Sequence, residues 1–153
     1  MLLELKSLFI EYNMFPFSLV FFAAFIYIGY KYWKARMVVR QIVPVDHVKN
    51  RIESGEKLIV YIIDPLKCSP CITQFPSVRN ILKKHSLPFV LVNYRDDEQY
   101  VKNLAGWKRV PALLAFQDGN PIKILDASNV FRISMDQYEN FAQEVNDIWK
   151  ISL

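Results

Sequence analysis

The sequence predicts an α/β fold, a central mixed sheet with helices on both faces, preceded by a single N-terminal transmembrane helix. Three observations lead to this prediction. A long stretch near the N-terminus carries no charge, and strand-like and helix-like apolar patterns alternate from residue 43 onward. The only two cysteines, Cys68 and Cys71, stand where a strand-like run gives way to a helix-like one. A length of 153 residues allows one domain and one appendage.

The uncharged stretch runs from residue 12 to residue 30 and is bracketed by Glu11 and Lys31. As a helix, about 19 residues would span roughly 28 Å, which nearly matches the hydrocarbon core of a bilayer. A buried soluble helix would show a polar face, and a cleaved signal peptide would have a basic start and a small-residue exit. The stretch has neither pattern, so it predicts an uncleaved single-pass anchor.

The anchor divides the chain into four predicted segments. They are a short N-terminal segment (1–11), a transmembrane helix (12–33), a basic linker (34–42) and an α/β domain (43–153). The apolar spacing between residues 2 and 10 also predicts a short interfacial helix.

Two arguments about the orientation of the anchor disagree. A single basic residue precedes it, whereas four follow it: Lys31, Lys34, Arg36 and Arg40. The positive-inside rule would therefore place the domain in the cytoplasm. Disulfide-forming chemistry would place it on the extracytoplasmic side. The side of the membrane stays open at this point.

The domain reads as a leading helix followed by the order β-α-β-α-β-β-α. The predicted elements are a helix at 47–54 with Asp46 as its N-cap, a strand at 57–63, a helix at 72–85, a strand at 88–94, a helix from 96 to 104 or 105, a strand at 110–116, a turn at 118–120, an edge strand at 122–125, and a last helix capped by Ser134. Such an order gives a mixed sheet with helices on both faces.

Three features stand together at a spacing that points to one family. Cys68-Ser69-Pro70-Cys71 follows the central strand, Pro76 stands five residues after the second cysteine, and Val110-Pro111 precedes the third strand. Residues 43–150 thereby resemble the thioredoxin family. The resemblance implies a thioredoxin-like fold and thiol–disulfide oxidoreductase activity. It also implies a cis Val110–Pro111 bond that faces the cysteines and exposes the Val110 backbone to a bound peptide.

The four-residue motif has a physical basis. A helix N-terminus favours the thiolate of Cys68 over the thiol, and Lys67 adds a positive charge with the same effect. Cys68 is therefore the expected nucleophile and Cys71, one turn deeper, the resolving cysteine. Pro70 stiffens the turn without forfeiting a needed hydrogen bond.

The sequence departs from the family pattern near the motif. Lys67 occupies the place of a tryptophan, and Ile62 stands where thioredoxins bury an acid that helps deprotonate the second cysteine. Asp64, two residues later, is a candidate proton-handling group. Residues 126–129 replace a glycine-rich partner-binding patch. These departures favour a dedicated protein partner over general-purpose reduction.

Other site classes find less support. Zinc would need two ligands besides the cysteines, and the only histidines, His47 and His85, are more simply read as solvated and structural. We therefore expect no metal and no cofactor. The net charge of +4 is mild and the basic residues form no stripe, so we expect no nucleic-acid partner. Trp107, Lys108 and Arg109 precede Val110-Pro111 and could touch a partner, but a loop packed on the core by Trp107 is the favoured interpretation.

Two functions remain open. The first is a membrane-anchored thiol–disulfide oxidoreductase that exchanges disulfides with a dedicated protein partner. The second is a thioredoxin-like binding or assembly subunit of a larger membrane complex, in which the cysteine pair is not catalytic.

Overall fold

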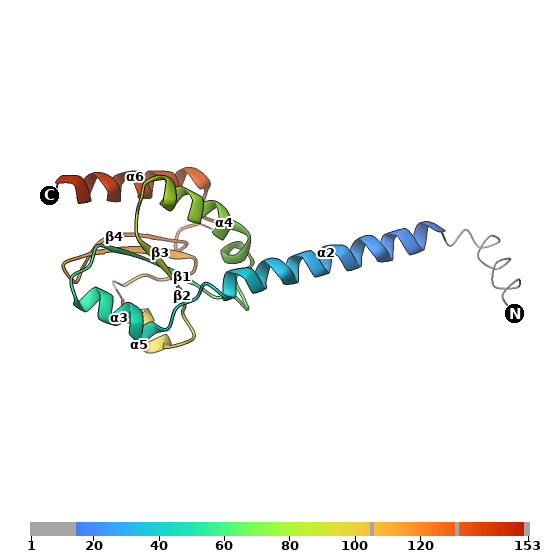
Figure 1. Ribbon diagram of the computed structural model, residues 1–153, viewed down its shortest axis with the longest axis horizontal. Coiled ribbons are helices and arrows are strands. Elements are labelled where there is room, and N and C mark those ends of the chain that lie inside the picture. The colour runs from blue at the N-terminus through green and yellow to red at the C-terminus, as the bar shows by residue number, and fades with distance from the viewer. Residues whose placement is uncertain (1–14, 105, 131, 152–153) are drawn as a thin grey trace, which may run out of the picture. The chain divides into compact units, whose positions relative to one another are not determined.

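The computed structural model describes residues 15–104, 106–130 and 132–151. Its elements, in chain order, are α2 (Phe15–Val39), α3 (Val45–Glu53), β1 (Leu58–Ile63), α4 (Ser69–Lys84), β2 (Phe89–Asn93), α5 (Glu98–Asn103), β3 (Ala112–Gln117), β4 (Asn120–Asp126) and α6 (Met135–Ile151) (Figure 1). The chain divides into two compact units, Met1–Arg36 and Met37–Leu153. The predicted N-terminal segment 1–11, with its interfacial helix at 2–10, lies outside the described residues.

The second unit is built on a four-stranded mixed sheet in the order β2-β1-β3-β4. β1 runs parallel to β2 and antiparallel to β3, and β4 returns beside β3 as an edge strand. All six residues of β1 are buried, as its β-branched apolar run predicts for a central strand. The predicted mixed sheet is confirmed.

Helices cover both faces of this sheet (Figure 1). On the face of α4 and α6, Tyr61 of β1 stacks on Phe75 with ring centroids 5.9 Å apart and meets the edge of Tyr138 at 6.5 Å. On the face of α3 and α5, a second cluster includes Val48, Val101 and alternate residues of β1. The alternation of side chains along β1 therefore supplies both layers of the core.

Several helix boundaries differ from the predictions by a few residues, and the difference at α3 changes the role of a predicted cap. α3 begins at Val45 with Pro44 as its N-cap, so Asp46 lies inside the first turn and does not cap the helix. There its charge still interacts favourably with the helix dipole. At α6 the predicted cap is present, because the Ser134 hydroxyl accepts from the Gln137 backbone N–H and the Gln137 side chain accepts from the Ser134 backbone N–H.

The first unit contains most of α2, which extends beyond the predicted end of the anchor at residue 33. The helix continues to Val39, so most of the predicted linker 34–42 is helical. From residue 19 to residue 33 its large apolar side chains are exposed, Phe21 by 74% and Phe25 by 81%. Across the described residues, no helix combines the length and apolar character needed to cross a bilayer. The first residues of the predicted anchor, 12–14, lie outside the described residues.

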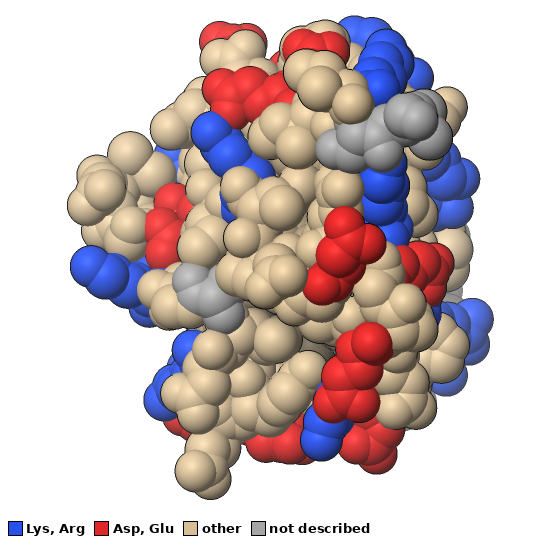
Figure 2. Space-filling view, turned by 90° about the vertical axis from the view of Figure 1, so that its left-hand side faces the viewer, with Lys and Arg blue, Asp and Glu red and all other residues tan. Residues whose placement is uncertain are grey.

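Acidic and basic side chains are interspersed on the face of the molecule that lies at the left-hand side of Figure 1 (Figure 2). Lys123 of β4 pairs with Glu144 of α6. Exposed pairs of this kind contribute little to stability. The two apolar clusters on either face of the sheet are therefore the main source of stability.

Matched leucine substitutions test this account of the core. Leu113 of β3 is fully buried, whereas Leu66 is 82% exposed. We expect Leu113→Ala to lower the free energy of unfolding by about 2–5 kcal/mol, because it opens a cavity in the core. Leu66→Ala should change it by less than about 0.5 kcal/mol. Urea unfolding of the full chain measures both, and equal losses would contradict the assigned burial.

Candidate active site

Cys68 lies where the chain passes from β1 into α4. β1 ends at Ile63, and after a four-residue loop Cys68 forms the N-cap of α4. A disulfide joins it to Cys71 one turn further on, with the two Cα atoms 5.3 Å apart. Cys68 is 9% exposed and Cys71 is fully buried. Only the sulfur of Cys68 is therefore placed for attack from outside.

The start of α4 polarises this sulfur. The Cys71 backbone N–H donates to Cys68 Sγ at 3.1 Å, which is the arrangement expected of an N-cap side chain. Pro70 stands in the first turn, where its missing N–H costs no helical hydrogen bond. When the disulfide is reduced, the same amide and the helix dipole favour the thiolate of Cys68.

Asp64 holds the loop that leads to Cys68. Its carboxylate is buried and accepts from the backbone N–H groups of Leu66 and Lys67, at 3.0 and 3.2 Å. Arg95 donates to both carboxylate oxygens, with Nε 3.1 Å from Oδ1 and Nη2 2.9 Å from Oδ2. The Asp64 backbone carbonyl accepts from the Cys68 N–H at 2.9 Å.

These contacts decide the charge of Asp64. The hydrogen-bonded ion pair with Arg95 is the main reason that the pKa of Asp64 is lowered from its ordinary value. A carboxylate that stays ionised and has its lone pairs occupied is a weak proton acceptor at neutral pH. The geometry favours a positioning role for Asp64 rather than the proton-handling role considered from the sequence.

An open groove of about 380 Å³ lies beside Cys68. One wall is the start of α4, and the other is the segment Arg109–Pro111 that leads into β3. The Val110–Pro111 peptide bond is cis, as the resemblance implied. The groove thus brings together five residues predicted for the site: Lys67, Cys68, Pro70, Val110 and Pro111.

Three residues near the groove were not predicted as site residues. Arg95 pairs with Asp64, Arg109 lines the groove, and Leu66 exposes an apolar side chain next to Lys67. Arg95 follows the end of β2, and the parallel pairing of β1 with β2 was the signal that could have placed it near Asp64. Trp107 is buried as predicted, with its indole N–H donating to the Val101 carbonyl at 2.6 Å.

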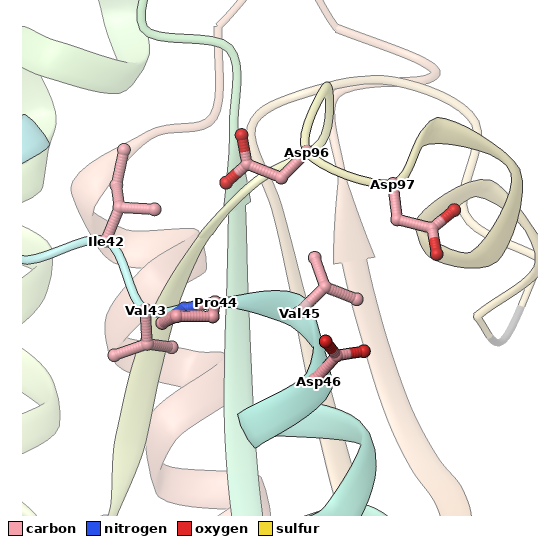
Figure 3. A pocket seen from close by; sticks show the side chains of 7 residues that line it. All are labelled: Ile42, Val43, Pro44, Val45, Asp46, Asp96 and Asp97. Atoms are coloured by element: carbon pink, nitrogen blue, oxygen red, sulfur yellow. The ribbon is translucent and has the colours of Figure 1, made fainter.

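Figure 3 shows a second pocket, where the chain enters the domain before α3. Three aspartates line it with the apolar segment 42–45. Asp96 accepts from the Asn93 side chain, and Asp97 caps α5 by accepting from the Tyr100 N–H. Two of the three carboxylates are therefore engaged in hydrogen bonds within the segment between β2 and α5 and the start of α5. Within residues 15–104, 106–130 and 132–151, no group of three or more His, Cys, Asp or Glu could hold a metal ion.

The Asp64–Arg95 pair predicts a pH-dependent stability difference. Asp64→Asn removes the charge and should lower the free energy of unfolding by roughly 2 kcal/mol at pH 7. Because the pKa of Asp64 is lower in the folded state, its contribution is fully present above the unfolded pKa of about 4 and is lost as pH falls through the folded pKa. The difference between wild type and variant should therefore be constant from pH 7 to pH 5 and shrink below pH 4.

Urea unfolding from pH 3 to pH 7 measures this difference. Asp96→Asn is the matched control. Asp96 is exposed, follows Arg95 directly, and accepts a hydrogen bond from the Asn93 side chain. A pH-independent difference for Asp64→Asn, or an equal loss in Asp96→Asn, would contradict the account.

Comparison with known proteins supports the fold at low sequence identity. No protein-family model matches the sequence, and no curated protein sequence is similar enough to count as a relative. Reduced thioredoxin pre-protein of Schistosoma mansoni is 18% identical, with a TM-score of 0.53, over 65% of this chain and 90% of its own. Plasmodium falciparum thioredoxin is 16% identical, with a TM-score of 0.52, over 71% of this chain and 98% of its own. Oxidised mitochondrial thioredoxin 3 of Saccharomyces cerevisiae is 16% identical, with a TM-score of 0.51, over 67% and 89%. The chain is thioredoxin-like in fold, with a Cys-x-x-Cys pair at the start of a helix.

Proposed function

We propose that this protein is a thiol–disulfide oxidoreductase that exchanges disulfides with a dedicated protein partner. The observation that carries the proposal is the position of the Cys68–Cys71 disulfide. It lies at a helix N-terminus, with its outer sulfur in an open groove beside a cis X-Pro bond. The thioredoxin-like fold and the buried second cysteine agree with this chemistry.

The proposed reaction is an exchange of two electrons through a mixed disulfide. In the reduced protein, the Cys68 thiolate attacks one sulfur of a partner disulfide, forms a Cys68–partner bond and releases the other partner sulfur as a thiolate. Cys71 then loses its proton and attacks Cys68 Sγ, which forms the Cys68–Cys71 bond and releases the second partner thiolate. The partner gains two electrons, and its two thiolates take up the proton lost by Cys71 and one from solvent, which replaces the proton that Cys68 lost on ionising. The reverse sequence oxidises a partner dithiol.

The surface next to the cysteines supports a dedicated partner. The segment 126–129, which stands in place of a glycine-rich patch, is held by its own side chains. Asp126 accepts from the Lys108 N–H at 2.7 Å and from the backbone N–H and the hydroxyl of Ser128. Such a segment offers less freely available backbone than a glycine-rich loop. Exposed Leu66 adds an apolar contact beside the motif.

Membrane anchoring is the second part of the proposal. The proposed span is the stretch 12–33, which begins before the described part of α2. From residue 19 to residue 33, α2 carries large apolar side chains in exposed positions on all sides. Soluble monomers rarely expose so large a contiguous apolar surface, and a bilayer would cover it. Lys31 and Lys34 place their ammonium groups over Tyr27 and Tyr30, a pairing suited to a membrane interface. Labelling of the reduced protein in intact cells with an impermeant maleimide would decide the side on which Cys68 lies.

Cysteine variants test the exchange reaction. The full chain should accelerate the reduction of a fluorescent disulfide peptide by dithiothreitol, and Cys68→Ser should abolish the acceleration because it removes the nucleophile. Cys71→Ser should trap mixed disulfides, visible as reducible adducts on non-reducing gels. Ser69→Ala is the control, since it changes the motif without touching either sulfur.

The opposite outcome has a defined meaning. A Cys68–Cys71 disulfide that resists mild reductant, with no adducts in Cys71→Ser, would reject the oxidoreductase and favour the assembly subunit. Loss of a membrane complex on removing both cysteines would then be the expected phenotype.

Charged substitutions in α2 test the anchor. Phe22→Arg with Ile26→Arg places two charges in the middle of the apolar stretch, at a cost of roughly 2.5–3.5 kcal/mol each in a bilayer. We expect this variant to leave the membrane fraction on alkaline extraction, while the wild type stays. Tyr32→Arg with Trp33→Arg adds the same charge at the basic end and should stay membrane-bound. Release of the wild type would overturn the anchor.

A further inference from the structure

Resting on the proposed function, we infer that the groove beside Cys68 selects an acidic partner: a protein segment that carries carboxylates next to its reactive cysteine. The inference concerns the charge of the groove, not the reactivity of the disulfide. It names the chemical class of the dedicated partner.

Cationic side chains stand on both walls of the groove. Lys67 precedes Cys68 on the wall formed by α4, and Arg109 precedes the cis Val110–Pro111 bond on the opposite wall. Both residues are exposed. No carboxylate lines the groove among the described residues, and none of those residues forms a salt bridge with Lys67 or Arg109. A segment lying between the walls would therefore have a cation on each side.

Two acids stand near these cations, Asp64 three residues before Lys67 and Asp126 in contact with the backbone of Lys108. Asp64 is buried, and its charge is offset by the Arg95 guanidinium, which contacts both of its oxygens. Asp126 accepts from the Lys108 N–H and from the backbone N–H and hydroxyl of Ser128, and within the described residues it forms no ion pair with the Arg109 guanidinium. The positive charges of Lys67 and Arg109 are left for a ligand.

This charge acts during the approach of the partner. In the exchange step, the Cys68 sulfur must come into bonding distance of the partner sulfur, so residues flanking the partner cysteine must enter the groove. Carboxylates at those positions would lie within a Debye length of Lys67 and Arg109, about 10 Å at 0.1 M salt. Attraction over that range raises association rates, commonly by 10-fold or more, and weakens with salt.

Peptide disulfides of differing charge provide the test. Three peptides of equal length would each carry one internal disulfide, flanked by two Glu, two Gln or two Lys residues. The reduced full chain, in a non-ionic detergent at pH 7, would reduce each peptide at 20 mM and at 500 mM salt. Each rate would be divided by the rate of the same peptide with dithiothreitol, which removes differences in intrinsic peptide reactivity.

The expected result is a normalised Glu-to-Lys rate ratio of about 10 or more at low salt, which falls several-fold at high salt. Lys67→Glu with Arg109→Glu should invert the ratio, and Lys67→Gln and Arg109→Gln should each lower it. Lys83→Glu is the matched control, because Lys83 lies at the far end of α4 and should leave the ratio unchanged. Because the ratio is taken within one variant, a change in the reactivity of Cys68 cancels.

Two failures are distinguishable. A ratio near 1 in the wild type, or one that survives the double charge reversal, would overturn the acidic-partner inference while leaving the oxidoreductase intact. If the chain reduced none of the three peptides, the proposed function would fail and the inference with it.

Discussion

The pairing of β1 with a strand on each side is the constraint on which the candidate site depends. β1 runs parallel to β2, with Ile63 opposite Asn93, and antiparallel to β3, with Ile62 opposite Ala112. The chain therefore leaves β1 and β2 and enters β3 at the same edge of the sheet. That edge collects the Cys68 loop, the Arg95 turn and the Val110–Pro111 segment. Full burial of β1 makes this register costly to change, since a one-residue slip would turn its side chains to the wrong layers.

Features carried by short stretches could be predicted from the sequence. The apolar run of β1, the Cys-x-x-Cys helix start, the Ser134 cap and the 118–120 turn each depend on neighbouring residues, so local patterns reveal them. The Asp64–Arg95 pair could not be found in this way, because it joins residues 31 positions apart through the β1–β2 register. For Arg109, the sequence offers partner contact only as the less favoured interpretation, because its place on the groove wall depends on the path of a loop.

The end of α2 shows a different limit of sequence patterns. Charges after residue 30 predict where an apolar segment meets water, but a helix does not have to stop there. Lys34, Ala35 and Arg36 are good helix formers, and the helix continues through them. Val38, near its C-terminal end, is then buried in the core of the second unit at 3% exposure. The end of an apolar segment and the end of a helix have different physical causes. Charged residues mark the first but do not by themselves end a helix.

The charges around the disulfide act on two steps through different contacts. Asp64 is ionised, and its charge is offset by the Arg95 guanidinium. It therefore positions the Cys68 loop without cancelling the positive charges of the groove residues Lys67 and Arg109. In the proposed exchange, Lys67 acts on the Cys68 sulfur and, together with Arg109, attracts an arriving partner, since both residues line the groove. Stabilising a thiolate changes the rate for every substrate alike, whereas attraction of a carboxylate depends on the substrate. An unpaired carboxylate at Asp64 would oppose both the Cys68 thiolate and an approaching acidic partner. The ion pair with Arg95 removes this repulsion, so that the two effects of the basic residues can be told apart.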